Sequence, residues 1–338
     1  MAQIRMKVSL TKLVAAFLLV VLVSMVMLAT YNECDYTGME QLTSHIRHLK
    51  DQIREQEMLL ARVRQTGSES DHGLLPEKDP GDNENWGPHK LAILIPFRDR
   101  FEELMEFVPY MHKFLVRQKV RHRFYVINQM DHHRFNRASL INVGYIISRK
   151  DCDYIAMHDV DLLPRNNNLS YRYEVVENGP HHLASPALHP NYHYEKFVGG
   201  ILLMQSQHFE LVNGLSNTFW GWGREDDELY MRMEEAKLKI SRPVGITTGY
   251  QSFFHIHDPT RRKRDRKRYG NQKLESFKRD TVTGVDTVLY EIRSTQELHI
   301  DGTPCTVLHV ELECDVSVTP WCDPPPEPVR KPVPKKAR

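Results

Sequence analysis

The alternation of apolar strands with amphipathic helices in the middle of the chain most constrains its fold. Short apolar runs of strand length are each followed by a segment whose apolar residues recur at helical spacing. The expected elements, in order, are a strand over 91–96, a helix over 101–116, a strand over 123–128, a helix over 137–148 and a strand over 154–158. This order predicts an α/β domain with a parallel sheet and a ligand crevice at the carboxyl ends of its strands. No G-x-G-x-x-G follows the first strand and no P-loop sequence occurs, so neither a dinucleotide-binding fold nor a P-loop ATPase is indicated.

An acidic pair follows the third of these strands. Asp159 and Asp161 stand one residue apart, on either side of Val160. Acids at the carboxyl end of a parallel strand lie where ligands bind, and two such carboxylates can share a hard divalent cation with a nucleotide diphosphate. A turn at the end of a strand would also use Asp, but in this position we favour the metal interpretation.

Two histidines farther along the chain point to the same chemistry. His255 and His257 are separated by Ile256 in a segment expected to be extended, which puts both imidazoles on one face. Together with an acid from elsewhere they could bind one metal ion. A lone histidine is usually structural, whereas His-x-His in the same domain as a strand-ending D-x-D indicates a metal site.

The stretch 219–228 has the least ordinary composition in the chain. It runs Phe-Trp-Gly-Trp-Gly-Arg-Glu-Asp-Asp-Glu. The four acids suit the first turn of a helix, expected over 225–237, where the helix dipole favours negative charge. That explanation leaves the tryptophans and glycines unaccounted for, since flat indoles on flexible glycines suit a platform for a sugar or base that rearranges on binding. A carboxylate beside such a platform is a candidate general base, and the residues alone do not separate Asp226 from Asp227.

Two other short sequences are expected near the ligand. Directly after the first strand, Arg98 and Arg100 bring two guanidinium groups to the edge of the sheet. Gly199 and Gly200 interrupt an apolar strand expected over 198–204, which indicates close approach of the backbone to a ligand.

The N-terminal segment predicts a membrane anchor. Residues 13–29 are apolar apart from Ser24; basic residues precede them and acids follow. By the positive-inside rule we expect a cytoplasmic tail over 1–12, a transmembrane signal-anchor over 13–31 and a lumenal remainder. A cleaved signal peptide is the alternative, but the apolar run is long for one.

Between the anchor and the folded domain we expect a stem over 32–85. Apolar residues at heptad-like spacing over 42–63 fit a coiled coil that pairs two chains and fit a solvated amphipathic stalk equally well. Residues 65–85 are rich in Gly, Ser, Asp, Glu and Pro, as is typical of a flexible linker. The folded domain is expected over 86–323, followed by a disordered, basic, proline-rich tail over 324–338.

Composition and cysteine content narrow the possibilities further. Lys and Arg number 45 and Asp and Glu 44, so no charge excess points to nucleic acid as a partner. Cys314 and Cys322 flank a short loop and are expected to form a disulfide, whereas Cys152 and Cys305 are expected to be free and buried. Asn168 begins an N-glycosylation sequon.

Taken together, these residues resemble the β-1,4-galactosyltransferase family, most closely the branch that acts on xylosylated proteins. The resemblance covers roughly residues 86–322. It rests on Pro96-Phe97-Arg98-Asp99-Arg100, Phe135-Asn136-Arg137-Ala138, Asp159-Val160-Asp161, Val198-Gly199-Gly200, residues 219–228 and His255-Ile256-His257. Arg224 and the close His-x-His spacing are what point to the xylose branch.

The resemblance implies a GT-A fold, an α/β fold with a Rossmann-like mixed sheet, and inverting transfer of galactose from UDP-galactose with Mn²⁺ as cofactor. The implied Mn²⁺ ligands are Asp161, His255 and His257. The residues implied to bind the donor are Pro96, Phe97, Arg98, Arg100, Phe135, Arg137, Asp159, Val160, Asp161, Phe197, Gly199 and Trp222. Phe197 stands where the family usually has Tyr, so a hydroxyl contact to the diphosphate is missing while the packing of the ring survives.

The same resemblance implies the acceptor side of the site. Asp226 would be the catalytic base that takes the proton from the 4-hydroxyl of xylose, and Glu225 and Asp227 would bind hydroxyl groups of the substrates. Trp222 would lie on a mobile loop that closes over the donor. The other residues implied at the acceptor are Tyr192, Tyr194, Gly223 and Arg224.

The expected partners are UDP-galactose and a xylosylated proteoglycan core protein, and the expected location is the Golgi membrane with the catalytic domain in the lumen. Two alternatives stay open: transfer to N-acetylglucosamine acceptors, and a catalytically idle sugar-binding scaffold. The basic run over 261–268 is expected to be a solvated loop, with contact to acidic protein around the acceptor as the alternative.

Overall fold

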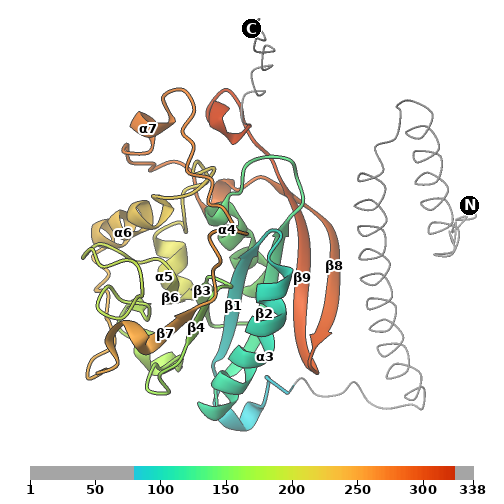
Figure 1. The fold of residues 1–338 in the computed structure, drawn as a ribbon, viewed down its shortest axis with the longest axis vertical. Helices are drawn as coiled ribbons and strands as arrows, with labels where there is room; N and C mark the ends of the chain where they lie inside the picture. Colours follow the sequence, from blue (N-terminus) through green and yellow to red (C-terminus); the bar gives the residue numbers. More distant parts are fainter. Residues whose placement is uncertain (1–79, 324–338) are drawn as a thin grey trace, which may run out of the picture. The chain divides into compact units, whose positions relative to one another are not determined.

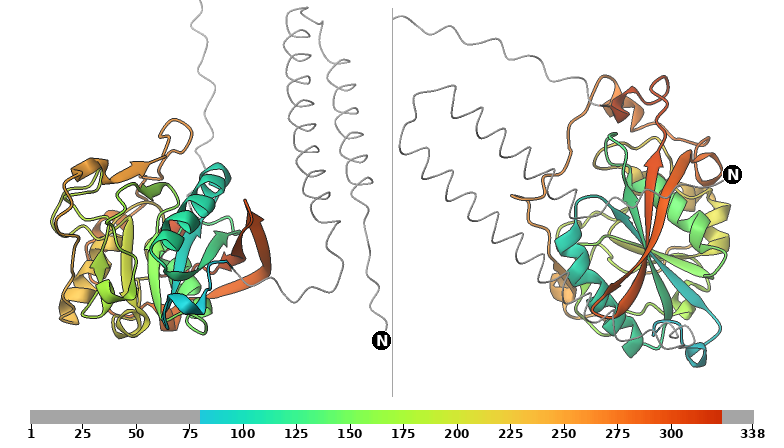
Figure 2. Two further views of the ribbon diagram at one scale, coloured as in Figure 1. Left: turned by 90° about the horizontal axis from the view of Figure 1, so that it is seen from below. Right: turned by 90° about the vertical axis from the view of Figure 1, so that its right-hand side faces the viewer.

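A computed structural model describes residues 80–323, which fold around a twisted mixed sheet (Figures 1 and 2). The sheet has seven strands in the order β5-β6-β3-β1-β2-β9-β8. Their bounds are β1 (Lys90–Phe97), β2 (Arg121–Gln129), β3 (Tyr154–His158), β5 (His181–His182), β6 (Ile201–Gln205), β8 (Tyr290–Ile300) and β9 (Thr303–Leu312). A separate two-stranded sheet pairs β4 (Leu162–Pro164) with β7 (Phe253–His255).

The centre of the large sheet is parallel and its margins are antiparallel. Strand β1 lies between β2 and β3 and runs parallel to both, and β2 runs parallel to β9. Strands β6 and β8 are antiparallel to β3 and β9, respectively. The three strands expected from the alternation therefore form the parallel centre, and later segments of the chain make the whole sheet mixed.

The helices follow the expected ranges closely. Helix α3 was expected over 101–116, α4 over 137–148 and α6 over 225–237. The observed bounds are α3 (Phe101–Arg117), α4 (Arg137–Ser148), α5 (Ser206–Leu211), α6 (Glu225–Glu235) and α7 (Gln272–Glu275). Helix α6 ends two residues early, close to Lys237, whose φ of 57° is incompatible with continuing a right-handed helix.

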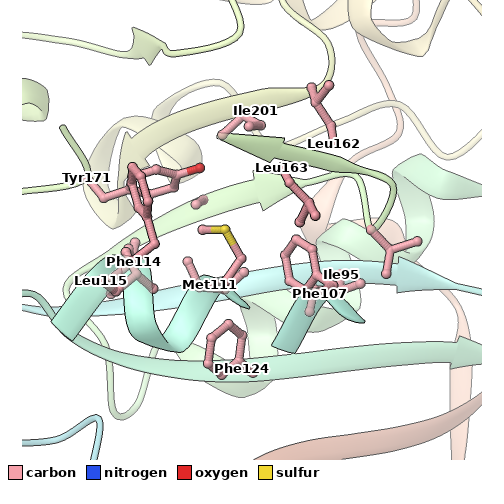
Figure 3. Packing of buried hydrophobic residues seen from close by; sticks show 14 of the residues in the cluster. Ile95, Phe107, Met111, Phe114, Leu115, Phe124, Leu162, Leu163, Tyr171 and Ile201 are labelled. Atoms are coloured by element: carbon pink, nitrogen blue, oxygen red, sulfur yellow. The ribbon is translucent and has the colours of Figure 1, made fainter. Parts of the chain in front are cut away.

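Alternate residues of β1 supply two hydrophobic cores, one on each face of the sheet. Leu91, Ile93 and Ile95 pack on the side of α3, whereas Ala92 and Leu94 pack on the side of α4. Figure 3 shows the first of these cores, in which aromatic and aliphatic side chains of α3 fill the space between the sheet and the segment after β3. Burial on both faces explains why the central strands are continuous apolar runs.

The strand expected over 198–204 begins later than expected, at Ile201. Gly200 has a φ of 76°, which an L-residue rarely adopts, so the regular strand starts only after it, at Ile201. Its carbonyl still accepts a hydrogen bond from the backbone N–H of Asp159 (3.0 Å). The glycine pair therefore turns the chain directly beside the D-x-D sequence.

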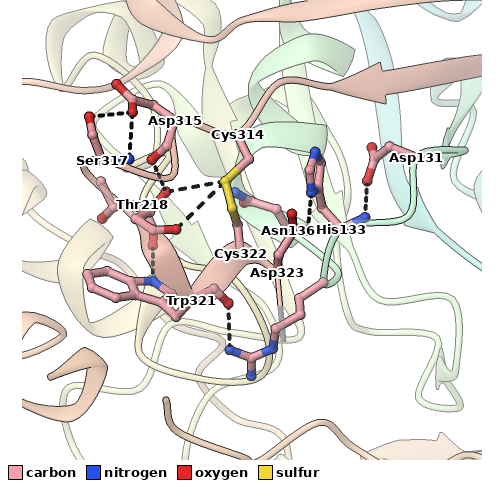
Figure 4. The surroundings of a disulfide bond; sticks show 12 residues. Asp131, His133, Asn136, Thr218, Cys314, Asp315, Ser317, Trp321, Cys322 and Asp323 are labelled. Atoms are coloured by element: carbon pink, nitrogen blue, oxygen red, sulfur yellow. Dashed lines mark hydrogen bonds and ion pairs between the residues drawn. A yellow bond between two sulfur atoms is a disulfide. The ribbon is translucent and has the colours of Figure 1, made fainter. Parts of the chain in front are cut away.

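A disulfide closes the C-terminal part of the domain (Figure 4). It joins Cys314 to Cys322, as expected, and both Cys152 and Cys305 are free and buried. Next to it, the indole N–H of Trp321 donates to the carbonyl of Thr218 (3.2 Å). The crosslinked turn thus packs against the start of the Trp-Gly stretch.

Removing this disulfide is expected to lower the free energy of unfolding. For the Cys314→Ser, Cys322→Ser double variant we expect a loss of about 2–3 kcal/mol, because a crosslink closing a short loop removes that much conformational entropy from the unfolded chain. Urea unfolding measures the change. Reductant should lower the stability of the wild-type protein by a similar amount and leave the double variant unaffected; an equal loss in both would contradict the assignment.

The ordered domain starts before residue 86. Asp82 forms ion pairs with Lys90 (2.7 Å) and Arg121 (2.7 Å), which ties residues 80–85 to the start of β1 and β2. The expected membrane anchor, most of the stem and the C-terminal tail lie outside the described residues and stay predictions. Within residues 80–323, no helix has the length and apolar character needed to cross a membrane.

Candidate active site

A cavity of about 610 Å³ lies at the carboxyl end of the parallel strands. Its walls come from the residues after β1 and β3, the start of α4, the N-terminus of α6 and parts of segments 189–200 and 257–268. The residues of the expected site that line it are Pro96, Arg98, Arg100, Phe135, Arg137, Asp159, Val160, Asp161, Tyr192, Tyr194, Phe197, Trp222, Gly223, Arg224, Glu225, Asp226, Asp227 and His257.

Phe97 does not belong to this set. Its side chain packs in the core on the α3 side together with Ile95 and Leu104. Successive residues of a strand point to opposite faces, so Phe97 shares the face of Leu91, Ile93 and Ile95. The side chain of Phe97 therefore does not line the cavity, and its contact with the donor stays a prediction.

Asp161, His255 and His257 meet because β4 pairs with β7. Leu162 stands opposite His255 in that small sheet, and the N–H of Ile256 donates to the carbonyl of Asp161 (2.9 Å). As a result, Nε2 of His255 lies 3.6 Å from one oxygen of Asp161, and Nδ1 of His257 lies 3.2 Å from the other. Two imidazole nitrogens and a carboxylate are donors that suit a borderline divalent cation.

The surroundings of Asp161 keep it ionised. Burial alone would raise the pKa of the carboxyl group, but hydrogen bonds and the charge interaction with His255 and His257 hold it well below its usual range. Nδ1 of His255 contacts the side-chain amide of Asn191 (3.1 Å), which orients the ring. The donor set is thus held in place by its neighbours, and a carboxylate with two imidazole nitrogens next to it fits a bound divalent metal ion.

The N-terminus of α6 brings Asp226 into the same cavity as Asp161 and His257. Asp226 accepts a hydrogen bond from Nη1 of Arg137 (3.0 Å), and Nε of the same arginine donates to Asp159 (2.9 Å). Burial raises the pKa of Asp226, and the opposite charge of Arg137 limits the rise. Arg137 therefore links the strand-ending acid to the helix acid, and it holds Asp226 in one orientation.

Glu225, the first residue of α6, has an unpaired oxygen. The residue is 9% exposed, and its Oε2 has no hydrogen-bond partner among the described residues. Burial and the adjacent charge of Asp226 raise its pKa to about 7. A buried acceptor that lines a cavity and lacks a partner is ready for a ligand hydroxyl group.

This raised pKa predicts a pH-dependent stability. The folded protein holds the proton of Glu225 more tightly than the unfolded chain does, so the free energy of unfolding should fall as pH rises from about 4.5 to about 7. Glu225→Gln removes the charge and should raise the free energy of unfolding at pH 8 by about 1–3 kcal/mol. The gain should vanish near pH 4. The same measurement on Glu313→Gln, at an exposed carboxylate, is the matched control, and a gain for Glu225→Gln that is independent of pH would contradict the explanation.

Gly199 leaves room for Asp226. A Cβ atom at position 199 would lie 2.3 Å from Oδ2 of that carboxylate. Gly199→Ala should therefore displace Asp226 and lower kcat at least about tenfold, because small misplacements of reacting groups have large kinetic effects. Gly302→Ala is the control for lost stability, since its Cβ has no neighbour within 4 Å while its φ of 75° strains the backbone away from Asp226. Unchanged kcat in Gly199→Ala would show that the position of Asp226 is not critical.

Two tyrosines face the acids from the opposite wall. The hydroxyl of Tyr194 donates to Oδ1 of Asp227 (3.0 Å), while the hydroxyl of Tyr192 accepts from Nη1 of Arg264 (2.6 Å). Burial and the charge of Asp227 raise the pKa of Tyr194 well above its usual range, so it stays a hydrogen-bond donor. The Phe197 ring is buried next to both tyrosines, and the expected ring packing is therefore present.

At the other end of the cavity, Arg98 braces the loop after β2. Its guanidinium donates to the carbonyls of Gln129 (3.3 Å), Asp131 (3.0 Å) and His133 (2.7 Å). It also lies 5.9 Å from the centre of the Phe135 ring. Most N–H groups of Arg98 thus donate to backbone carbonyls of the protein itself, and the side chain forms this wall of the cavity.

The basic run over 261–268 is not simply solvated. Arg262 pairs with Glu103 (2.8 Å) on α3, and Arg268 donates to the carbonyl of Trp222 (2.8 Å). The N–H of Trp222 in turn donates to the carbonyl of Asp265 (2.9 Å). This run therefore forms a wall of the cavity and joins the Trp-Gly stretch, which corrects the expectation of a free loop.

Two further residues contribute to the site without having been expected. His189 lines the cavity, and its Nδ1 accepts from the backbone N–H groups of Asn191 (2.9 Å) and Tyr192 (3.1 Å). Arg134 is buried and donates to Asp265 (2.6 Å) and to the carbonyl of Lys267 (2.9 Å). Neither stands in a recognisable sequence pattern, and Arg134 reaches partners more than 130 positions away in the chain.

Asn168 is exposed, so its side chain is accessible to glycosylation. Attachment of a glycan there stays a prediction.

The site combines three features. A D-x-D sequence follows a strand of a mixed α/β sheet, two imidazoles lie next to its second carboxylate, and buried acids begin helix α6. These features are typical of metal-dependent transferases that use nucleotide-activated sugars. Residues 41–174 match the family described as the N-terminal region of glycosyl transferase group 7, and residues 179–256 match the one described as the N-terminal domain of galactosyltransferase. The chain belongs to the β-1,4-galactosyltransferase family.

Its relatives place it in one branch of this family. β-1,4-galactosyltransferase 7 of Mus musculus is 59% identical over 250 residues, which are 73% of this chain and 76% of the relative. Xylosylprotein 4-β-galactosyltransferase of Caenorhabditis elegans is 48% identical over 239 residues, which are 69% of this chain and 82% of the relative. Both names belong to the xylose branch that the sequence motifs indicated.

Solved structures of a Drosophila relative have the same fold. The catalytic domain of Drosophila β-1,4-galactosyltransferase 7 in complex with xylobiose superimposes with a TM-score of 0.69 at 54% identity, covering 70% of this chain and 100% of that one. A mutant of the same enzyme is in complex with manganese, UDP-Gal and xylobiose; it gives the same TM-score and identity and covers 70% and 99% of the two chains. The expected GT-A type of fold, with its central mixed sheet, is therefore confirmed.

Proposed function

We propose that this protein transfers galactose from UDP-galactose to the 4-hydroxyl of a β-linked xylose on a protein, with inversion at the anomeric carbon. The observation that carries the proposal is that Asp226, Asp161 and His257 line one cavity, with His255 next to Asp161. The relatives named for this activity, and the Drosophila complex with manganese, UDP-Gal and xylobiose, support it. Xylosylated proteoglycan core proteins are the proposed acceptors.

The proposed metal site is the set formed by Asp161, His255 and His257. Mn²⁺ bound there would supply Lewis-acid stabilisation of the negative charge that develops on the departing UDP. The ion pair between Arg137 and Asp159 keeps that part of the cavity ordered before the donor arrives. Phe135 and Pro96, at the same end of the cavity, provide apolar walls for the uridine.

Asp226 is the proposed base. Its carboxylate lies in the same cavity as the metal set, and Arg137 holds one of its oxygens while the other faces Gly199. It would take the proton of the xylose 4-hydroxyl as that oxygen attacks the anomeric carbon of galactose from the face opposite UDP. A raised pKa makes a carboxylate a better proton acceptor. Inversion in one displacement needs only this one base.

The remaining groups orient the acceptor and exclude water. Glu225 offers its unpaired Oε2 to a sugar hydroxyl, and Asp227 and Tyr194 form the hydrogen-bonded wall next to it. Trp222 is 37% exposed and is held by hydrogen bonds to residues of segment 261–268, so this pair of loops can cover the donor together.

An acceptor panel tests this proposal. With UDP-galactose and Mn²⁺, methyl β-xyloside should accept galactose and N-acetylglucosamine should accept it at least about a hundredfold more slowly. Preference for N-acetylglucosamine would move the activity to another branch of the family. Sugar binding without turnover of either acceptor would point to a binding protein instead.

A further inference from the structure

A second cavity, also of about 610 Å³, adjoins the active-site cavity beyond the acids of α6. Three residues line both cavities: Tyr194, Arg224 and Asp227. Since Tyr194 and Asp227 are joined by a hydrogen bond, this pair forms a shared wall between the two. The second cavity therefore begins where the proposed acceptor site ends.

Helix α6 connects the two cavities along one face. Asp227 and Met231 are four residues apart, so they lie one above the other on the helix, and Met231 lines the second cavity. Asp226, which contacts Arg137, is the residue before Asp227 and lies about a quarter of a turn around the helix from this face. A molecule that extends from Asp226 past Asp227 would reach the second cavity.

The opposite wall is the segment after α7. Nε of Arg224 donates to the carbonyl of Ser276 (2.9 Å), and its guanidinium stacks on the ring of Phe277 at 3.8 Å from the ring centre. Phe277 is nevertheless 63% exposed. A large aromatic side chain held in place and left open to solvent offers apolar contact area to a ligand.

Charged groups around the second cavity are mostly compensated within the protein. Arg279 pairs with Glu228 (3.2 Å), Lys278 pairs with Glu275 (2.8 Å), and Arg224 lies 3.7 Å from Asp227. Binding in this cavity therefore depends on apolar and backbone contacts rather than on an excess of one charge.

We propose that the second cavity binds the polypeptide that carries the acceptor xylose, an inference that rests on the proposed function. In a xylose ring the 4-hydroxyl and the anomeric carbon lie at opposite ends. When the 4-hydroxyl faces Asp226, the anomeric carbon and the amino acid attached to it point away from the donor. In this orientation the xylose extends toward the shared wall at Tyr194 and Asp227. The acceptor polypeptide attached to the xylose then enters the second cavity.

Kinetics with two acceptors test the inference. The acceptors are a short xylosylated peptide and methyl β-xyloside, and the variants are Phe277→Ala, which removes the aromatic wall, and Met231→Trp, which fills the cavity. We expect kcat/KM for the peptide to fall at least about fivefold in both variants while kcat/KM for methyl β-xyloside stays within about twofold. Leu274→Ala, at a 69% exposed residue outside both cavities, is the matched control and should leave both acceptors unaffected.

The outcomes are distinct. Equal losses for both acceptors in Met231→Trp, or no loss for the peptide in either variant, would overturn the inference. If Phe277→Ala harms both acceptors because Arg224 shifts, Met231→Trp decides the question alone. Since the charges around the second cavity are paired, the ratio of kcat/KM for the peptide to kcat/KM for methyl β-xyloside should change less than about twofold between low and high salt. A strong dependence of this ratio on salt would contradict recognition without net charge. Failure of the proposed function would look different, since the wild-type protein would then not act on methyl β-xyloside.

Discussion

Replacing Asp226 by asparagine is expected to lower kcat for galactose transfer by about a thousandfold, with little change in the KM for UDP-galactose. A general base in the transition state contributes about 10²–10⁴-fold, and an amide cannot accept the proton. The fold should persist, because the amide oxygen can still accept the hydrogen bond from Arg137 that now holds the carboxylate. Steady-state kinetics together with a thermal unfolding curve separate the loss of chemistry from a loss of folding.

Asp227→Asn is the matched control for this result. Asp227 is the next residue of α6, accepts from Tyr194 and lies 3.7 Å from Arg224, so its replacement should mainly raise the KM for the acceptor. If Asp227→Asn lowered kcat more than Asp226→Asn did, the assignment of the base would have to move by one residue. The sequence could not make this choice on physical grounds, because both acids belong to the same first helical turn.

Loss of one metal ligand should have an effect of comparable size. His257→Ala removes one of two imidazoles from Asp161, and we expect the concentration of Mn²⁺ needed for half-maximal activity to rise at least about a hundredfold. A chelator should abolish transfer by the wild-type protein, and added Mn²⁺ should restore it. Electron paramagnetic resonance of free Mn²⁺ measures the change in binding independently of activity.

The control is His193→Ala, which changes an exposed histidine whose ring lies tilted against Tyr250 and is not one of the two that pair with Asp161. It should bind Mn²⁺ like the wild-type protein. Undiminished Mn²⁺ binding in His257→Ala would mean that the ion is held elsewhere in the molecule.

Local patterns predicted the elements of this fold well. Helix α4 was expected at its observed bounds, and the parallel centre of the sheet follows from strands that alternate with helices. The D-x-D and His-x-His sequences were visible as candidate ligands for the same reason, since each is a short, local pattern. The alternation of side chains along β1 likewise predicts that the side chain of Phe97 lies in the core, where the structure has it.

Contacts between distant parts of the chain could not be predicted in this way. Asp161 meets His255 only because β4 pairs with β7, more than 90 residues later in the sequence. The wall formed by Arg268 and Trp222 depends on a hydrogen bond between two loops, and sequence alone favoured solvent for that basic run. These contacts arise from the tertiary packing of irregular segments, for which no periodic pattern exists.

The most direct test of the proposed activity is the structure of its product. The protein is incubated with UDP-galactose and methyl β-xyloside, with Mn²⁺ and with chelator, in parallel with its Asp226→Asn variant. The product is examined by nuclear magnetic resonance. We predict a galactose in β-linkage to the 4-oxygen of xylose, formed only with Mn²⁺ and nearly absent in the variant. An α-linked product, a different linkage position or undiminished product from the variant would contradict inverting transfer with Asp226 as the base.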